Sequence, residues 1–249
     1  MPKPISLSII IPNFNSGVLL EKTLKSVFSN PIFLSFEVWV IDNCSSDHPE
    51  KIIDQFQYDN LYFSSQSDSG VYDAMNKGIL QANGKWMIFL GAGDELLAEN
   101  LAQLPFDDPD LKMIYGDVYL MHREDTFGGE FSLLTLMKYN ISHQAIFYHC
   151  SVFEEIGLYD LRFKIAADYV FNLNLFFKYL DSVNYFPVTV SRYLGDGMSD
   201  RMRDEYFRNN KVFIVNKIFL THFKLTYLSS VIYFNWFYLN LLVRYLLKK

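Results

Sequence analysis

The feature that most constrains this chain is a short apolar run near its N-terminus, residues 7–11 (LSIII), which stops at Pro12 and Asn13. A run of this length without polar alternation is typical of a strand that is buried on both faces of a parallel sheet. Residues 18–28 then carry apolar side chains at a helical period. A buried strand followed by a helix predicts a βαβ unit, in which the helix returns the chain to a parallel neighbour.

The same alternation continues along the next part of the chain. Apolar runs at 36–41, 61–63 and 86–90 predict three more strands, and residues 71–82 predict a helix between the last two. Another helix is expected to begin at Pro49, because proline is well placed in a first turn. Together these units predict an α/β fold, Rossmann-like, with a mainly parallel sheet flanked by helices.

After Asp94 the pattern is looser. The expected elements are strands at 113–120, 141–148 and 183–193, a polar loop or hairpin at 121–130, and a helix over 167–180 that opens with Asp168. Pro187 marks the last strand as an edge strand or as the place of a break, because proline cannot donate to a sheet ladder.

The length of 249 residues allows a sizeable core, and half of the residues are hydrophobic. We expect one α/β domain over residues 1–210 and a helical tail over residues 211–249. Cys44 and Cys150 are too few and too isolated for a disulfide framework or a zinc site, and they suit a reducing compartment. The N-terminal sequence has no secretory signal, so we expect the main domain in the cytoplasm.

The net charge of −6 is unevenly distributed. Residues 211–249 contain six of the 22 basic residues and no acidic residue, so residues 1–210 carry sixteen basic against 28 acidic residues, a net charge of −12. Binding to the phosphates of nucleic acid requires a basic face. Nucleic acid is therefore not expected as a partner of the main domain.

Polar residues follow four of the predicted strands, at 12–15, 42–43, 66–68 and 94–95. In open parallel sheets, ligands bind outside the carboxyl ends of the strands. We therefore expect these four groups to converge on one edge of the sheet. Asp42 and Asp94 each follow an apolar strand, where a carboxylate has no role in the core.

Six motifs occur in sequence along the chain: SIIIPNFN, VIDNCSSD, DSGVYDAMNKG, FLGAGDE, SHQAIF and AADY. In these motifs and their order the chain resembles the family-2 glycosyltransferases, a group with the GT-A fold. It is most similar to the bacterial enzymes that build colanic-acid and O-antigen repeat units. The resemblance spans residues 7–199 and implies transfer of a sugar from a nucleotide-sugar donor.

The resemblance also implies a donor site, which would contain Pro12, Phe14, Asn15, Asp42, Asp68, Lys77, Gly93 and Asp94. The carboxylate of Asp42 could accept hydrogen bonds from the nucleoside, and the family's use of this position favours UDP over GDP. Alternatively, Asp42 serves only its own turn or caps a helix, although Ser46 and Asp47 are the better-placed caps for the helix at Pro49. For Asp73 and Lys77 the alternative is an exposed i,i+4 ion pair.

Asp94 matches the family's metal-binding DXD-type motif, which implies that Mn²⁺ or Mg²⁺ neutralises the diphosphate leaving group. The residue two positions earlier is Ala92, so only one aspartate of the motif remains. Glu95 could assist as a ligand or point to solvent.

Asp168, in AADY, matches the family's catalytic acidic position, which implies a general base for the acceptor hydroxyl in an inverting transfer. Its alternative role is that of a helix N-cap. His143 and Gln144 would line the acceptor side of the cleft, although a lone histidine on an apolar strand is usually a core residue. Ser199 lies in a segment (GDGMS) that resembles a loop closing over the donor, and Tyr193 and Leu194 stand where many relatives have a histidine.

Residues 225–243 contain no charged side chain and are rich in aromatic residues. The segment has about the length of a membrane span, but its polar residues fall near one side at helical spacing. We therefore expect an interfacial helix on an anionic cytoplasmic leaflet, which suits a polyprenyl-diphosphate-linked acceptor. A transmembrane span and packing against the main domain or a second subunit are the alternatives.

The sequence thus predicts a transferase of a hexose-type sugar that acts in surface polysaccharide assembly at the inner face of the cell membrane. A sugar-phosphate nucleotidyltransferase would need basic residues in the loop after the first strand, and PNFNSG has none. A dehydrogenase would need a G-x-G-x-x-G turn, which the sequence lacks. A catalytically inactive sugar-nucleotide-binding or scaffold protein remains the alternative from another class.

Overall fold

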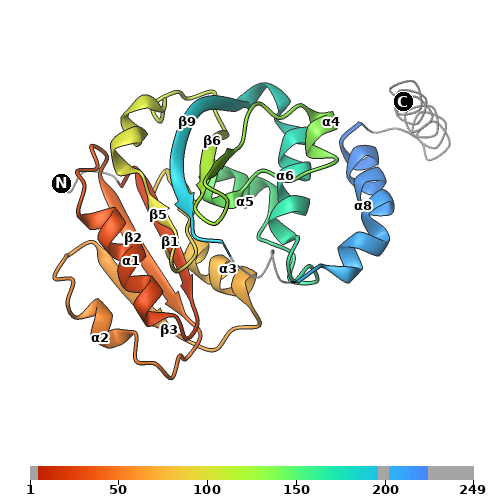
Figure 1. Cartoon of the computed structure of the whole chain (residues 1–249). Coiled ribbons are helices and arrows are strands. Elements are labelled where there is room, and N and C mark those ends of the chain that lie inside the picture. The colour runs from red at the N-terminus through yellow and green to blue at the C-terminus, as the bar shows by residue number, and fades with distance from the viewer. Residues whose placement is uncertain (1–4, 196–201, 224–249) are drawn as a thin grey trace.

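The structure is a computed structural model that describes residues 5–195 and 202–223. Its first part alternates strands and helices as predicted (Figure 1). The elements are β1 (Leu7–Asn13), α1 (Gly17–Phe28), β2 (Phe36–Asp42), α2 (Glu50–Ile53), β3 (Leu61–Ser65), α3 (Val71–Gln81) and β4 (Trp86–Phe89). Every strand and helix expected before Asp94 is confirmed, although α2 is only a single short turn.

The second part is less regular, as the sequence pattern suggested. It contains β5 (Glu95–Leu96), η1 (Ala98–Gln103), β6 (Met113–Leu120), β7 (Asp125–Phe127), α4 (Leu133–Leu136), η2 (His143–Ala145), β8 (Ile146–His149), α5 (Ser151–Ile156), α6 (Ala167–Lys178), η3 (Leu180–Ser182), β9 (Val183–Tyr193) and α8 (Glu205–Phe223). The strand predicted over 141–148 is wrong in its first half, where Ser142 precedes the 3₁₀ turn η2. Side chains of this turn bind residues far along the chain, and such tertiary contacts override a local apolar pattern.

The described strands form one sheet in the order β3-β2-β1-β4-β8-β6-β9-β5, with β7 paired to β6. The pairs β1–β2, β2–β3, β1–β4 and β6–β9 are parallel, whereas β4–β8, β6–β8, β6–β7 and β5–β9 are antiparallel. The prediction of a mainly parallel sheet is therefore wrong, and the sheet is mixed. Each connection from β1 to β4 contains a helix, as parallel neighbours require, whereas the connections from β4 to β5 and from β6 to β7 contain none.

Strand β9 shows what Pro187 does. The strand lies inside the sheet, between β6 and β5, so it is not an edge strand. Its register with β6 shifts between the pairs Tyr115–Tyr185 and Asp117–Thr189, and Pro187 lies in that irregularity. The predicted break is thus confirmed, because an irregular segment tolerates a residue that cannot donate to the ladder.

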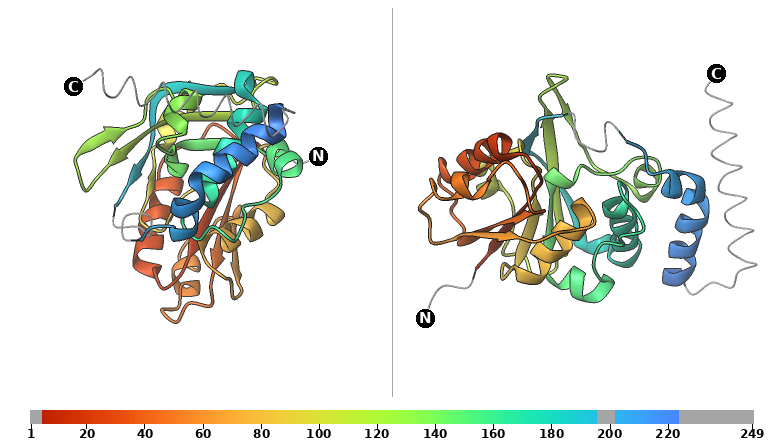
Figure 2. Two further views of the ribbon diagram at one scale, coloured as in Figure 1. Left: turned by 90° about the vertical axis from the view of Figure 1, so that its right-hand side faces the viewer. Right: turned by 90° about the horizontal axis from the view of Figure 1, so that it is seen from below.

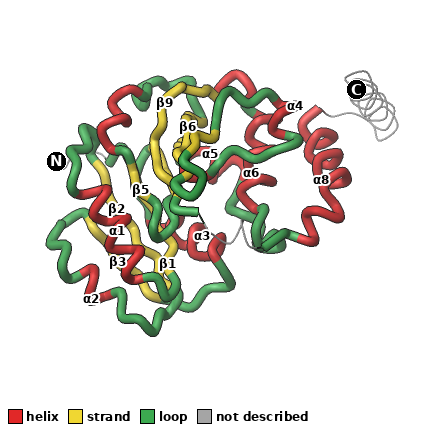
Figure 3. Tube along the Cα trace, viewed as in Figure 1, coloured by secondary structure: helices red, strands yellow, loops and turns green. Residues whose placement is uncertain are grey.

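Helices cover both faces of the sheet, and each face has its own apolar cluster (Figure 3). Leu7, Ile9 and Ile11 of β1 pack into the cluster on the side of α1, whereas Ile10 packs on the side of α3. All four are fully buried. The burial of alternate residues on opposite faces confirms the reading of residues 7–11 as a strand with two covered faces.

Helix α8 packs against α6 and runs through the boundary predicted between residues 210 and 211 (Figure 2). Phe207 lies against the ring of Tyr169, and Lys211 Nζ is 2.9 Å from the hydroxyl oxygen of Tyr169. Within residues 5–195 and 202–223, no helix has the length and apolar character that a membrane crossing requires. The predicted membrane helix over 225–243 lies outside the described residues.

Candidate active site

The carboxyl ends of β1 and β2 bring two of the predicted polar groups together. Asn13 and Asp42 are paired in the register of these strands, and Asn13 Nδ2 donates to Asp42 Oδ1 over 2.8 Å. The third group joins them, because the backbone N–H of Asp68 donates to Asn43 Oδ1 over 2.8 Å. Three of the four groups therefore meet at one edge of the sheet, as expected.

Asp42 is 1% exposed and is surrounded by hydrogen-bond donors. Besides Asn13, the backbone N–H and hydroxyl of Ser45 and the hydroxyl of Ser65 donate to its two oxygens over 2.5–3.0 Å. Burial alone would raise the pKa of Asp42, but the hydrogen bonds from Ser45, Ser65 and Asn13 hold it below its usual value. The carboxylate is therefore kept ionised, and it stabilises the turn after β2.

The cap predicted for α2 is wrong. Asp47 Oδ2 accepts a hydrogen bond from Gly17 N over 2.7 Å, so Asp47 serves the first turn of α1, and α2 has no side-chain cap. Asn15, in a left-handed conformation with φ of 47°, accepts from Ser46 N over 2.9 Å and donates its own N–H to Ser45 Oγ over 2.8 Å. The loops after β1 and β2 are thus tied to each other.

Phe14 and Pro12 flank this polar cluster. Phe14 is 58% exposed, whereas Pro12, within β1, is half-buried. An aromatic ring that stands exposed beside buried polar groups is available to stack on a planar ligand.

The loop between β3 and α3 holds Asp68 and Lys77. Burial raises the pKa of Asp68, although its carboxylate accepts a hydrogen bond from Gly70 N over 2.8 Å. Lys77 Nζ donates to the carbonyl of Ser67 over 2.6 Å, and Asp73 accepts from Ser69 N. Within the described residues, the alternative ion pair between Asp73 and Lys77 is not formed.

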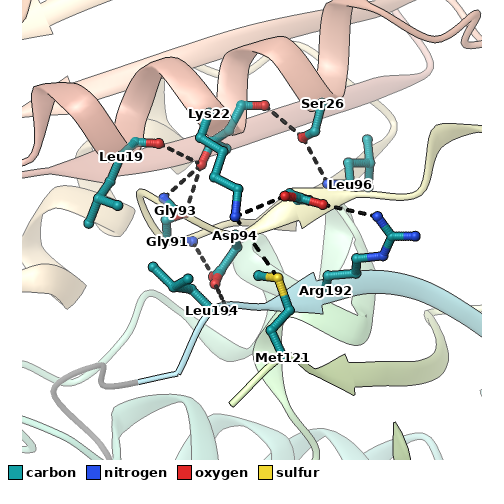
Figure 4. A network of polar contacts seen from close by, with 12 residues as sticks. Leu19, Lys22, Ser26, Gly91, Gly93, Asp94, Leu96, Met121, Arg192 and Leu194 are labelled. Atoms are coloured by element: carbon teal, nitrogen blue, oxygen red, sulfur yellow. Dashed lines mark hydrogen bonds and ion pairs between the residues drawn. The ribbon is translucent and has the colours of Figure 1, made fainter. Parts of the chain in front are cut away.

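Asp94 anchors the loop after β4 (Figure 4). Its carboxylate accepts hydrogen bonds from Gly91 N over 2.9 Å, from Gln144 Nε2 over 3.0 Å and from Leu194 N over 3.2 Å. Asp94 is 3% exposed, and burial raises its pKa in spite of these donors. Gly93 adopts a φ of +102°, and a Cβ there would lie 2.8 Å from Leu194 Cδ2. The loop is therefore closely fitted to the end of β9.

Glu95 neither assists Asp94 nor points freely to solvent. Its carboxylate forms ion pairs with Lys22 over 3.0 Å and with Arg192 over 3.2 Å (Figure 4). Burial would raise the pKa of Glu95, but Lys22 and Arg192 hold it below its usual value. Across the parts of the chain that the structure describes, no group of three or more His, Cys, Asp or Glu side chains could hold a metal ion.

Asp168 is 6% exposed and lies inside the first turn of α6. Tyr72 OH donates to Oδ1 over 2.7 Å, Tyr169 N donates to the same oxygen over 2.8 Å, and Asn140 Nδ2 donates to Oδ2 over 2.9 Å. Burial raises the pKa of Asp168, against the opposing effect of His143 and these donors. The N-cap of α6 is Ala166, so the alternative of an N-cap role for Asp168 is wrong.

Two of the three residues of η2 face the two carboxylates. His143 Nδ1 lies 3.9 Å from Asp168 Oδ2, whereas Gln144 Nε2 binds Asp94. The side chain of His143 is 26% exposed, so it is not a core histidine. Its charge opposes the rise in pKa that burial causes at both Asp94 and Asp168. Asp94, His143, Gln144 and Asp168 therefore form one continuous site.

The sequence interpretation missed two residues of this site, Tyr72 and Asn140, and included Asn13 only as a member of the polar group 12–15. Tyr72 lies in the DSGVYDAMNKG motif, which gave a signal for the segment but not for the hydroxyl. Asn140 lies outside the six motifs, and no sequence signal pointed to it. Ser199, predicted in the donor loop, lies outside the described residues.

Known proteins resemble the chain over most of its length. Residues 8–155 match the family described as Glycosyl transferase family 2. A PGL/p-HBAD biosynthesis glycosyltransferase of Mycobacterium bovis is 36% identical over 209 residues, which cover 80% of this chain and 81% of the relative. A GalNAc(5)-diNAcBac-PP-undecaprenol beta-1,3-glucosyltransferase of Campylobacter jejuni is 40% identical over 108 residues, 42% of this chain and 34% of that enzyme.

Solved structures share the fold at low sequence identity. TarS of S. aureus in complex with UDP-GlcNAc has a TM-score of 0.70 and 19% identity, covering 88% of this chain and 72% of that chain. The mannosyltransferase PcManGT of Pyrobaculum calidifontis, in complex with GDP-Man and Mn²⁺, has a TM-score of 0.59 and 13% identity, covering 90% and 66%. The family match, the sequence relatives and these neighbours agree: the chain belongs to the family-2 glycosyltransferases and has the GT-A fold.

Proposed function

We propose that this enzyme is an inverting transferase that moves a hexose-type sugar from a nucleotide sugar to a saccharide acceptor in glycoconjugate assembly. Asp168 carries the proposal. It is a nearly buried carboxylate with a raised pKa, and the turn η2 connects it to the loop of Asp94. A carboxylate with a raised pKa takes up a proton more readily than an ordinary one, which is what a general base requires.

In the proposed reaction, Asp168 takes the proton of the acceptor hydroxyl. The acceptor oxygen bonds to the anomeric carbon while the bond from that carbon to the diphosphate breaks, and the electron pair leaves with the nucleoside diphosphate. His143 and Gln144 lie on the side of the site where this acceptor would bind. A single displacement of this kind inverts the configuration of the anomeric carbon.

The donor nucleotide would bind at the edge formed by β1, β2 and the loop before α3. The exposed ring of Phe14 is available to stack on a base, and the polar groups around Asp42 and Asp68 would bind the nucleoside. Pro12, Asn15, Lys77 and Gly93 complete the proposed donor site. UDP is favoured, on the family's use of the Asp42 position. TarS has been solved with UDP-GlcNAc and PcManGT with GDP-Man, so the fold itself accepts either base.

A divalent cation, Mn²⁺ or Mg²⁺, fits Asp94 as a site with one protein carboxylate. Within the described residues, Asp94 Oδ1 accepts a single hydrogen bond, from Leu194 N, so this oxygen retains a lone pair for a cation. Such a cation commonly takes one or two carboxylates from the protein and its other ligands from substrate phosphates and water. When bound, it would neutralise charge on the diphosphate leaving group.

The acceptor is proposed to be a polyprenyl-diphosphate-linked saccharide. The name of the Campylobacter jejuni relative describes a lipid-linked substrate of this class, and that of the Mycobacterium bovis relative describes PGL/p-HBAD biosynthesis. An acceptor that stays in the bilayer would require the enzyme to work at the membrane surface. We assign this contact to the tail (211–249), with the catalytic domain (1–210) on the cytoplasmic side and Ser199 in a loop over the donor.

A catalytically inactive sugar-nucleotide-binding or scaffold protein is the alternative. Membership of a glycosyltransferase family counts against it, and against a nucleotidyltransferase. The inactive protein would bind the donor without turning it over, so a measurement of turnover in the wild-type protein and in Asp168→Asn separates the two alternatives.

Replacing Asp168 with Asn is expected to lower kcat by about 10²–10⁴-fold, the usual contribution of a general base. Hydrolysis or transfer would be followed with the nucleotide sugar that the wild-type protein turns over fastest in a panel. Asp160→Asn is the control, because Asp160 binds the exposed Arg162. Equal turnover in Asp168→Asn and the wild type would reject Asp168 as the base.

Removal of divalent cations with EDTA is expected to abolish turnover, and Mn²⁺ or Mg²⁺ should restore it. Asp94→Asn should raise the Mn²⁺ concentration that gives half-maximal activity. Glu95→Gln is the matched control, because the Glu95 carboxylate is held by Lys22 and Arg192. This substitution should leave the Mn²⁺ requirement unchanged. Full activity in EDTA would contradict the metal assignment.

Deletion of residues 224–249 is expected to abolish co-sedimentation with anionic liposomes while donor hydrolysis persists, because the catalytic residues lie outside the deleted segment. Neutral liposomes serve as the control for the electrostatic part of binding. A truncated protein that still sediments with anionic liposomes would show that the tail is not the membrane contact.

A further inference from the structure

The two oxygens of Asp168 have different surroundings. Oδ1 accepts from Tyr72 OH and from Tyr169 N, whereas Oδ2 accepts from Asn140 Nδ2. His143 Nδ1 faces Oδ2 from 3.9 Å, which is beyond hydrogen-bond distance. A carboxylate has about four acceptor positions, two on each oxygen. In the part of the chain that the structure describes, Oδ1 is therefore saturated and Oδ2 retains one position.

Asn140 is itself held by a buried polar chain. Asn172 Nδ2 donates to Asn140 Oδ1 over 3.0 Å, and Tyr148 OH donates to Asn172 Oδ1 over 2.7 Å. Tyr148 and Asn172 are fully buried, so neither has water as an alternative partner. These hydrogen bonds join β8, α6 and the segment before η2.

The chemistry of these groups fixes the direction of the hydrogen bonds from Tyr148 through Asn172 and Asn140 to Asp168. An ionised carboxylate only accepts, so Asn140 must turn its amide nitrogen towards Asp168 and its amide oxygen towards Asn172. Asn172 then presents its nitrogen to Asn140 and its oxygen to the hydroxyl of Tyr148. Reversing either amide would oppose two donors or two acceptors in a buried position and would leave buried polar groups unsatisfied.

We propose that Asn140 is a positioning residue for the catalytic base and that Asp168 Oδ2 is the oxygen that takes the proton. This inference rests on the proposed function. The acceptor O–H proton passes to the free position on Oδ2 as the acceptor oxygen bonds to the anomeric carbon and the diphosphate leaves with its electron pair. Asn140 occupies the other position on Oδ2 throughout, so the carboxylate cannot rotate away from the acceptor.

The test uses the full chain with Asn140 replaced by Asp. The variant has the same shape but removes the donor to Oδ2 and adds a like charge, which favours the protonated form of Asp168. The titratable groups that face Asp168 are His143 and the buried Tyr72, Tyr148 and Tyr159. Burial raises the pKa of the three tyrosines well above its usual value, so they stay neutral in the working pH range, and His143 is present in every variant.

The expected result is a kcat profile whose acidic limb moves to higher pH in Asn140→Asp. A shift of one pH unit would lower kcat about tenfold at pH values below the limb and leave a smaller loss at high pH. Binding of UDP, followed by thermal shift, should be unchanged. Asn174→Asp is the matched control. Asn174 lies on α6, as Asp168 does, but its amide donates to the carbonyl of Val170 on that helix and not to Asp168.

Two outcomes would overturn the inference. One is a pH profile in Asn140→Asp that coincides with that of Asn174→Asp. The other applies if Asn140→Asp fails to fold, in which case Asn140→Ala, which adds no charge, is measured instead. The inference is then overturned if Asn140→Ala keeps the wild-type kcat and the wild-type position of the acidic limb. Asp168→Asn is measured alongside. Full activity in that variant would reject the proposed base, whereas an inactive Asp168→Asn with unaltered Asn140 variants would reject only the role of Asn140.

Discussion

The site depends on hydrogen-bond donors that offset the cost of burying three carboxylates. Asp42, Asp94 and Asp168 are almost entirely removed from water. An uncompensated buried carboxylate costs several kcal/mol, so each must be supplied with donors by the surrounding fold. Asp42 receives them from the last residues of β1 and β3 and from the loop after β2. Asp94 receives them from its own loop, η2 and the residue after β9. Asp168 receives them from α3, α6 and the segment before η2. Satisfying these charges connects elements that the chain order leaves far apart.

The different donor sets give the carboxylates different properties. The hydroxyl and amide donors around Asp42 outweigh its burial and lower its pKa, so it remains a fixed charge at the carboxyl ends of β1 and β2. At Asp94 and Asp168 burial outweighs the donors and raises the pKa. Separation of this kind is how neighbouring acidic groups take different roles in one site. Asp204 extends the arrangement to α8, because it accepts from Ile165 N and Ala166 N, just before Asp168, and from Phe207 N in the first turn of α8.

The sequence was sufficient to predict those elements whose determining interactions are local. The apolar runs of β1, β2 and β4 and the helical period of α1 predicted those elements, and the polar residues after the strands predicted where they would meet. The motifs also indicated the family. Asp168 was found in this way, through AADY, and not through its surroundings.

The remainder could not be predicted, because it depends on partners distant in sequence. Tyr72 and Asn140 bind Asp168 across 96 and 28 positions, and Asp47 serves α1 across 30 positions, so their roles have no local pattern. The antiparallel half of the sheet was missed for a related reason: the regular alternation of strand and helix ends at β4, and the order of the later strands follows from packing. Residues 143–145 form a turn instead of a strand because Gln144 binds Asp94.

The central claim is that one carboxylate, Asp168, activates the acceptor for a single displacement at the anomeric carbon. The most direct measurement is the configuration of the first-formed product, read from the anomeric proton coupling by ¹H NMR before mutarotation. The account predicts the configuration opposite to that of the donor sugar. A product that retains the donor configuration would require a covalent intermediate or a front-face reaction, and it would contradict the role assigned to Asp168.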